Sequence, residues 1–336
     1  MTASTDRQPW MVSQQDFPSH LPVAAQLRYL LQYAILAPSS KNTQPWHFSV
    51  AGDTIGLFAD LTRWHPIADC GRRELYISLG CALENLLVAS EQFGFGHSVN
   101  YFPRQRNEEL VATVVLHPGG SPCACRSGIS LATMIDRRTQ HGRYRQTSID
   151  EAIRRRLLAC SRILGVRIDL TEDRSIRRRV MELNLHADEM EFASPEFRLE
   201  LGHWLGEGGN GSPRLLARLA GRLVARFDVG RVVGKINAAK LARGPLVGLI
   251  SSRVDDRVSQ LKAGQALERL WLHATRFELG LQPMSQALEV PSLRLELAQV
   301  IPGGGWVPQQ VFRLGYPVHA TGGHTSRRPL SQVLLD

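Results

Sequence analysis

The spacing of apolar residues changes twice near the amino terminus of the chain. From Leu21 to Leu36 apolar positions recur every three or four residues, which predicts a helix that ends before Pro38. From Trp46 to Val50 they alternate as in a strand, and Gly52-Asp53 separates this run from a second one at Thr54 to Phe58. The pattern predicts a helix followed by a β-hairpin.

A long helix and two further strands are expected next. The helix ends at Gly94-Phe95-Gly96, and strands follow at Ser98 to Phe102 and Val111 to Leu116. Residues 117 to 128 are rich in Pro, Gly and Ser, and this composition predicts a linker between two halves. The leucines on the apolar face of the helix are Leu75, Leu79, Leu83, Leu86 and Leu87.

An internal repeat relates the two halves. A shift of 184 positions (264 minus 80) lays Gly80 to Gly96 over Gly264 to Gly280, and seven of these seventeen positions agree. Such a repeat predicts that both halves have the same arrangement of helices and strands. It also predicts that the halves pack about a pseudo-twofold axis, as the subunits of a dimer would if their genes were fused. The agreeing pairs are Gly80/Gly264, Ala82/Ala266, Leu83/Leu267, Glu84/Glu268, Leu86/Leu270, Phe93/Phe277 and Gly96/Gly280.

Composition narrows the class of protein only in part. At 336 residues, 43% of them hydrophobic, the chain is long enough to bury a sizeable core. No apolar run approaches the roughly 18 residues that cross a membrane, and the start of the chain lacks the apolar middle of a signal peptide, so a cytoplasmic location without a transmembrane segment is expected. The five cysteines are irregularly spaced, which indicates neither a disulfide framework nor a metal site. The net charge of +9 suits anionic partners without choosing among them.

A polar turn joins the first helix to the hairpin, and it reads Pro-Ser-Ser-Lys-Asn-Thr-Gln-Pro-Trp from residue 38. Its short polar side chains can face a ligand or bond to their own backbone, so one interpretation is a capped helix-to-strand connection. The pattern also resembles the flavin-contacting turn of the FMN-dependent nitroreductase superfamily. That resemblance implies that the FMN contacts are Pro38, Ser39, Ser40, Asn42 and Gln44.

Two basic segments of the second half resemble the phosphate-binding parts of the same superfamily. The first is Arg-Arg-Thr-Gln-His from residue 137, and the second follows a Gly-Tyr-Pro strand end near the carboxyl terminus. By itself an Arg-Arg-Thr cluster is more often a solvated loop. The first half has no counterpart, so one complete flavin site is expected rather than two. The resemblance implies that the phosphate is surrounded by Arg137, Arg138, Thr139, His141, Arg327 and Arg328.

Two further features concern the flavin ring. The segment with Gln282, Pro283 and Met284 follows the repeated helix, and the resemblance implies that its backbone passes the isoalloxazine, with an N–H near flavin N5. A helix C-cap and turn is the other interpretation of this segment, and both interpretations can hold.

His141 occupies a position where the family usually has Lys or Arg near flavin N1. A neutral histidine stabilises anionic reduced flavin less than a fixed cation does, which argues against rapid turnover.

Within the superfamily the chain is most similar to the fused, double-repeat Acg-like branch. The resemblance implies an α+β, nitroreductase-like fold with two pseudo-symmetric repeats in one chain, each a sheet flanked by helices. The expected organisation is an extension at 1–24, a first half at 25–118, a linker at 119–129 and a second half at 130–332, in which 191–243 forms a lid. Because the dimer interface of ordinary nitroreductases would then be internal, the chain can be a monomer.

The expected function is that of an FMN-binding oxidoreductase of NAD(P)H nitroreductase type. Hydride would pass from NAD(P)H to flavin N5 and then to a small-molecule electron acceptor, a nitro compound or a quinone; the cofactor carries the chemistry, so no catalytic side chain or metal is required. The alternative is a non-catalytic, FMN-sequestering stress-response flavoprotein whose lid closes the flavin site. The sequence leaves open whether the flavin turns over or is stored.

Two other motifs compete with this interpretation. Gly206 to Gly211 spells GxGxxG, but a dinucleotide site needs a buried strand before it, and the charged amphipathic run from Phe197 to Leu205 favours a flexible connection. The next helix carries arginines every four residues from Arg214 to Arg226, beside several leucines. Such a helix can lie on a membrane or on nucleic acid, but the commoner arrangement is a solvated arginine stripe with leucines packed internally, so no specific nucleic-acid partner is expected.

Overall fold

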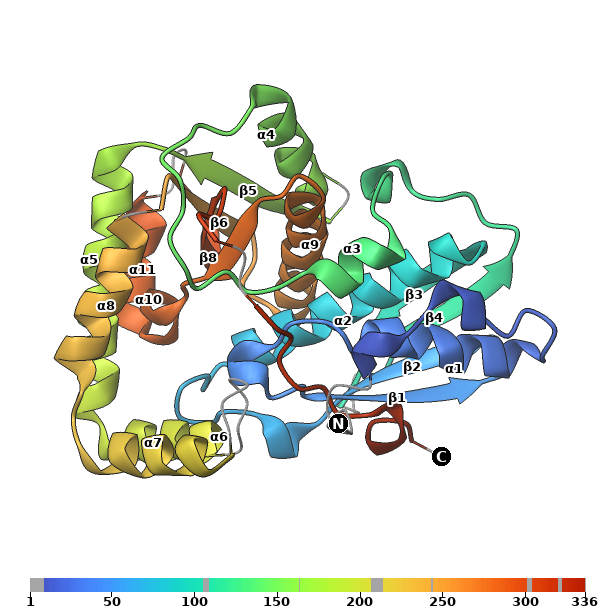
Figure 1. Cartoon of the computed structure of the whole chain (residues 1–336), viewed down its shortest axis with the longest axis horizontal. Helices are drawn as coiled ribbons and strands as arrows, with labels where there is room; N and C mark the ends of the chain where they lie inside the picture. The colour runs from blue at the N-terminus through green and yellow to red at the C-terminus, as the bar shows by residue number, and fades with distance from the viewer. Residues whose placement is uncertain are drawn as a thin grey trace.

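Two four-stranded antiparallel sheets, each covered by helices, make up the fold (Figure 1). The computed structural model describes residues 9–104, 109–162, 164–206, 214–242, 244–300, 304–319 and 322–335. The sheet of the first half has the strand order β1-β2-β4-β3, and the sheet of the second half has the equivalent order β5-β6-β8-β7. The predicted α+β class and the two pseudo-symmetric repeats are therefore confirmed.

The strands of the first sheet agree with the pattern of apolar residues. The predicted hairpin is present, with Trp46 opposite Ala59 and Ala51 opposite Thr54. Its strands are β1 (Trp46–Ala51), β2 (Thr54–Ala59), β3 (Phe95–Tyr101) and β4 (Leu110–Pro118). The second sheet consists of β5 (Val166–Thr171), β6 (Leu246–Ser252), β7 (Gly280–Pro283) and β8 (Val307–Gly315).

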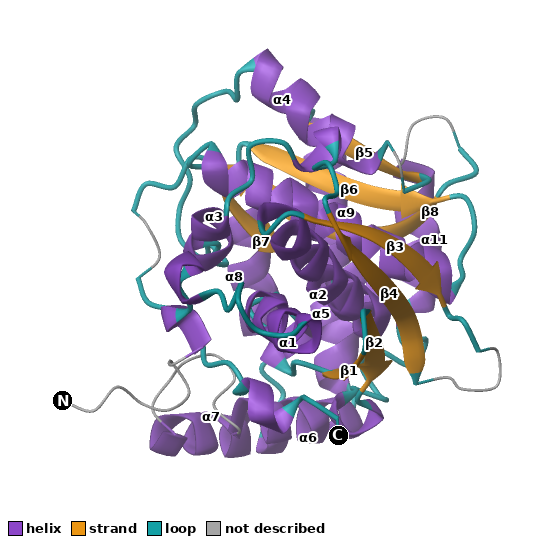
Figure 2. Cartoon of the chain, turned by 90° about the vertical axis from the view of Figure 1, so that its right-hand side faces the viewer, coloured by secondary structure: helices purple, strands orange, loops and turns teal. Residues whose placement is uncertain are grey.

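The two helices that carry the sequence repeat form the centre of the molecule. α2 (Arg73–Gln92) packs on the first sheet, α9 (Arg257–Arg276) packs on the second, and the two helices pack on each other (Figure 2). Almost every residue of α2 is buried, because one side of the helix faces its sheet and the other faces α9. The first predicted helix is α1 (Val23–Ala34), which packs on α2 and β1.

The segment expected to be a linker is anchored to this centre. Arg126, in a short 3-10 turn (Ala124–Arg126), is buried and donates hydrogen bonds to Glu84 and Glu91 of α2. The second half then begins with α3 (Leu131–Asp136) and α4 (Glu151–Leu158). Residues between the two sheets therefore help to hold the halves together.

The largest difference between the halves lies between the first two strands of each sheet. A tight turn joins β1 to β2, whereas four helices separate β5 from β6. α6 and α7 lie side by side at one edge of the molecule, and α8 packs on α5 (Figure 1). These helices are α5 (Arg174–Ala193), α6 (Pro195–Gly206), α7 (Arg214–Arg226) and α8 (Gly230–Ala242).

The glycine-rich fingerprint lies mostly outside the described residues, but the segment before it is helix α6, not the strand that a dinucleotide site needs. Two short helices, α10 (Gln286–Glu289) and α11 (Pro291–Val300), complete the second half. Among the described residues, none of the helices has both the length and the apolar character needed to cross a membrane.

Candidate functional site

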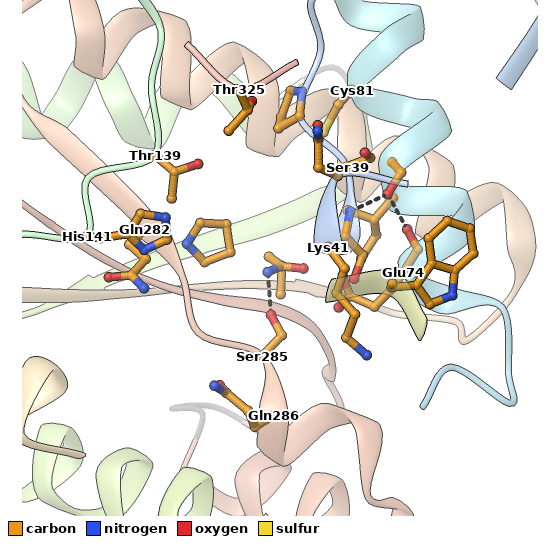
Figure 3. Close-up of a pocket in the computed structure, with 18 of the residues that line it drawn as sticks. Ser39, Lys41, Glu74, Cys81, Thr139, His141, Gln282, Ser285, Gln286 and Thr325 are labelled. Carbon is orange, nitrogen blue, oxygen red and sulfur yellow. Dashed lines mark hydrogen bonds between the residues drawn. The ribbon is translucent and has the colours of Figure 1, made fainter. Parts of the chain in front are cut away.

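A cavity of about 630 Å³ lies where the two halves meet (Figure 3). The structure brings eleven of the fourteen sequence-predicted residues to its wall, and they come from four separate segments. These eleven are Pro38, Ser39, Ser40, Asn42, Arg137, Arg138, Thr139, His141, Gln282, Pro283 and Arg327. Their part in cofactor binding stays a prediction, but their convergence makes this cavity the candidate site.

The polar turn after the first helix forms one wall. Lys41, Asn42 and Gln44 have left-handed φ values of 50°, 58° and 52°, so the backbone reverses sharply here. The Ser39 hydroxyl accepts a hydrogen bond from the Gln44 N–H at 2.9 Å, and the Ser40 N–H donates to Ser78 of α2 at 3.1 Å. The turn is thus capped as the first interpretation predicts, and it also directs the Lys41 side chain into the cavity (Figure 3).

Arginines from the two basic segments meet at one end of the cavity, here called the basic end. Arg137 and Arg327 both donate to the Leu36 carbonyl at 3.1 Å, and Arg327 also donates to the Asn42 side chain at 2.9 Å. Arg138 donates to Nε2 of His324 at 3.2 Å. These bonds join the end of the first helix to residues that lie far apart in the sequence.

Several buried N–H groups at the basic end have no hydrogen-bond partner among the described residues. They are Nε of Arg137, Nε of Arg138, Nε of Arg327 and Nδ1 of His324. Because buried donors in folded proteins are nearly always paired, such a group of donors indicates an anionic ligand. Glu268 offsets part of the positive charge, since its carboxylate lies 3.3 Å from Nε of Arg137.

Burial and the neighbouring Arg138 lower the pKa of His324 to about 4, so its ring is neutral at pH 7. Since its Nε2 accepts from Arg138, the proton is assigned to Nδ1. The Trp10 ring stacks on His324 with centroids 4.1 Å apart and an interplanar angle of 16°. Trp10 also donates to the Thr325 carbonyl at 2.8 Å, so residues near the amino terminus complete the wall.

The opposite end of the cavity carries carboxyl groups from three helices. Glu74 comes from α2, Glu191 from α5 and Glu289 from α10, and Lys41 lies among them. Burial raises the pKa of Glu191 well above its usual range, and a hydrogen bond with Glu289 raises it further. The environment of Glu191 therefore favours its protonated form, and this acidic end differs sharply from the basic end.

The edge of the second sheet supplies a further wall. Gly280 to Pro283 forms strand β7, not only the turn after a helix. The segment with Thr139 runs beside it, since Thr139 forms a parallel bridge with Leu281. Arg313 donates to the Gln282 side-chain oxygen at 2.8 and 2.6 Å, which fixes this side chain near Thr139 and His141 (Figure 3).

Three predicted residues are not among those that line the cavity. Gln44 turns away because its side-chain oxygen accepts the Arg328 N–H at 2.7 Å. Arg328 in turn donates to Asp60 at 3.2 Å. Met284 is buried in the apolar cluster between β8 and α5.

Trp10, His324 and Thr325 are among the lining residues that sequence reasoning missed. A tryptophan in an otherwise polar amino-terminal stretch is a signal of packing against the domain, but nothing in the sequence pairs it with His324. The apolar floor between the basic and acidic ends was also missed as a site. It consists of Ile77 and Cys81 of α2 and Leu267 and Trp271 of α9.

The chain shares sequence over most of its length with two proteins of Mycobacterium tuberculosis. One, named "Putative NAD(P)H nitroreductase Rv3131", is 29% identical over 338 residues, which cover 94% of this chain and 93% of the relative. The other, named "Putative NAD(P)H nitroreductase acg", is 24% identical over 315 residues, which cover 91% and 94%. The chain is homologous to these Acg-like proteins. No family model matches the sequence.

Solved structures match a smaller share of this chain, with lower sequence identity. The FMN-dependent nitroreductase NfnB from Mycobacterium smegmatis, in complex with NADPH, matches 54% of this chain and 84% of its own, with 15% identity and a TM-score of 0.39. A BluB-like flavoprotein from Clostridium difficile matches 61% and 98%, with 12% identity and a TM-score of 0.41.

Proposed function

We propose that the cavity binds one FMN and that the chain is an NAD(P)H-dependent oxidoreductase of nitroreductase type. The observation that carries this proposal is the group of buried N–H donors of Arg138, Arg327 and His324, which have no hydrogen-bond partner among the described residues and would be satisfied by the phosphate oxygens. Nε of Arg137 already lies 3.3 Å from the Glu268 carboxylate. The cavity volume lies in the range of cofactor sites. The names of the relatives support the same activity.

The phosphate contacts alone would bind the cofactor weakly. Charge-assisted hydrogen bonds contribute roughly 1.5–3 kcal/mol each, whereas immobilising a ligand costs something like 4–15 kcal/mol. Much of the affinity must therefore come from the apolar floor, to which Ile77, Leu267 and Trp271 contribute. In this proposal the apolar residues of α2 and α9 would hold the flavin ring. Arg137, Arg138 and Arg327 would hold the phosphate.

When bound, FMN would supply the redox chemistry that links oxidation of NAD(P)H to reduction of a nitro compound or quinone. The protein positions and shields the ring. Ser39 stands on one side of the cavity, and Thr139 and Gln282 stand on the other (Figure 3). The bond from Arg313 holds Gln282 in place before any ligand arrives, which lowers the cost of binding.

The segment 191–243 serves in this proposal as the lid. Phe197 and Trp204 of α6 and Val233 of α8 line the cavity, and Phe197 also lies under the Lys41 ammonium at 5.2 Å. A cover made of helices that the first half lacks can move without disturbing either sheet. The relatives' names do not favour the alternative of a flavin-storing protein.

Titration of the purified protein with FMN, followed by quenching of flavin fluorescence, tests the proposal. We expect one site per chain and bleaching of the bound flavin by NADPH. Arg138→Gln should weaken FMN binding by roughly ten- to a hundredfold, the equivalent of one charge-assisted bond. Arg143→Gln, at an exposed neighbour, is the matched control and should bind as the wild type does.

Failure of the wild-type protein to bind FMN would overturn the proposal. Equal affinity of the Arg138 and Arg143 variants would refute the assignment of the phosphate to the basic end. Binding without any reduction by NADPH would instead indicate a storage protein.

A further inference from the structure

In the described part of helix α7, the small residues Ala217 and Gly221 face the protein, whereas three leucines are exposed. Ala217 and Gly221 are buried, and a Cβ atom on Gly221 would lie only 2.3 Å from the Gly202 carbonyl oxygen of α6. The converse contact is similar, since a Cβ on Gly202 would lie 2.5 Å from the Gly221 oxygen. The two backbones therefore touch, and the contact leaves no room for larger side chains between the helices.

Because the small residues face α6, the apolar stripe of α7 faces outward. Leu216, Leu219, Leu223 and Phe227 are spaced by three, four and four residues, so they share one face. They are 58%, 49%, 59% and 58% exposed. For Leu216, Leu219 and Leu223, this corrects the expectation that the leucines of the arginine-rich helix pack internally.

Arginines lie next to this apolar stripe. Arg218, Arg222 and Arg226 follow one another at four-residue intervals and are all exposed. Between residues 214 and 228 only Asp228 is acidic. α7 lies at the outer edge of the molecule in both overall views (Figures 1 and 2), and none of its side chains from residue 216 to 226 lines the cavity. The helix thus presents an apolar stripe, a basic stripe and a buried face that holds it to the protein.

We propose that α7 docks on the surface of an anionic phospholipid bilayer, with its leucine stripe among the acyl-chain ends and its arginines at the headgroups. Helices that lie in a membrane interface have this combination of a strong apolar stripe and flanking cationic side chains. The charge favours a lipid surface over a second copy of the chain, since two such arginine stripes would repel each other. The exposed leucines favour a lipid surface over nucleic acid. The phosphates of a nucleic acid attract arginines, but they provide no apolar surface on which the leucines could be buried.

Vesicle flotation with the full-length protein tests this docking surface. We expect binding to vesicles of phosphatidylglycerol and phosphatidylcholine, and little binding to phosphatidylcholine alone. The triple variant Arg218→Gln, Arg222→Gln, Arg226→Gln should lower the partition coefficient by about a hundredfold, since each arginine contributes roughly fivefold near an anionic surface. The double variant Leu219→Gln, Leu223→Gln should lower it at least tenfold.

Matched controls come from exposed residues elsewhere. Leu295→Gln on α11, at a side chain that is 71% exposed, and Arg178→Gln on α5 should bind vesicles as the wild type does. Circular dichroism spectra and urea unfolding curves like those of the wild type would show that the α7 variants fold. This readout does not involve FMN, so a failure of the docking proposal and a failure of the proposed function can be told apart.

Three results would overturn the proposal. The first is no partition of the wild-type protein onto anionic vesicles. The second is a concentration-dependent dimer in sedimentation that the leucine variant abolishes, which would assign the stripe to a second copy. The third is binding to duplex DNA that depends on the arginines and not on the leucines, together with vesicle binding that none of the variants changes.

Discussion

Gly80 of α2 and Gly264 of α9 lie against each other where the two central helices cross. A Cβ atom on Gly80 would be 2.0 Å from the Leu261 carbonyl oxygen, and one on Gly264 would be 2.1 Å from the Ile77 carbonyl oxygen. The two glycines are equivalent positions of the sequence repeat. The pseudo-twofold axis of the molecule therefore passes close to this contact.

Alanine at either of these glycines should destabilise the protein. Because the obstructing atoms belong to backbone, they cannot rotate away, and we expect each of Gly80→Ala and Gly264→Ala to lower the free energy of unfolding by about 3 kcal/mol. Urea unfolding followed by circular dichroism measures the loss. Gly71→Ala is the control, since nothing lies within 4 Å of its Cβ position, and it should change stability by less than about 0.5 kcal/mol. Equal stability of all three variants would contradict the close helix contact.

Glu84, four residues further along α2, should make the protein sensitive to acid. It is fully buried and receives paired hydrogen bonds at 2.7 and 3.0 Å from each of Arg126 and Arg269. Burial alone would raise the pKa of Glu84, but the two arginines hold it well below its ordinary value of 4.5. A carboxyl group with a lowered pKa adds stability above its unfolded pKa, and that stability is lost as the pH falls below about 4.5.

The variant Glu84→Gln tests the predicted contribution of the ionised Glu84 to stability. It removes the carboxylate that pairs with the buried Arg269 and leaves Arg126 with Glu91 alone, so we expect a loss of about 3–5 kcal/mol at pH 7. The loss should shrink as the pH falls from about 4.5 toward 2, because only the wild type is weakened there. Glu182→Gln, in an exposed pair with Arg178, should cost less than about 0.5 kcal/mol throughout. A deficit that stays constant across this range would refute the linkage.

The spacing of apolar residues predicted the strands of the first sheet and its helices well. Apolar residues alternate in a half-buried strand and recur every three or four positions in a helix, so their spacing shows which face is buried. Most of the cavity wall was predicted through the resemblance to the nitroreductase superfamily, which rests on the polar turn between Pro38 and Pro45 and on two arginine pairs. The local chemistry of these motifs fits a capped turn or a solvated loop equally well. The leucines of α7 were misplaced because hydrophobicity alone does not show that Ala217 and Gly221 let two backbones touch. The pairing of Trp10 with His324 could not be predicted, since it joins residues 314 positions apart (324 minus 10) by tertiary packing alone.

Trp10 should contribute to FMN affinity if the proposed function is right. Its ring holds His324 by stacking and lies 4.8 Å from the Arg327 guanidinium, so its loss would loosen the basic end. We expect Trp10→Ala to weaken FMN binding by roughly tenfold in a fluorescence titration, and Trp10→Phe to restore much of the loss. The same affinity for all three proteins would show that the amino-terminal residues are not part of the site.

Glu191 offers a pH test of the acidic end that does not depend on any ligand. Its pKa is raised by burial and by the hydrogen bond with Glu289, so the folded protein holds a proton that the unfolded chain releases near its ordinary pKa of 4.5. For such a group, stability is fully present below the unfolded pKa and is lost as the pH rises toward the folded one. Glutamine in its place resembles the protonated carboxyl group at every pH.

Glu191→Gln should therefore match the wild type in stability near pH 4.5 and exceed it at about pH 8.5, by more than the ~0.5 kcal/mol of an ordinary surface substitution. Urea unfolding at the two pH values measures the difference. Glu189→Gln, at an exposed position of the same helix, should show no such dependence. A gain of equal size at both pH values would mean that the variant merely packs better, and a loss at high pH would mean that Glu191 is ionised beside Lys41.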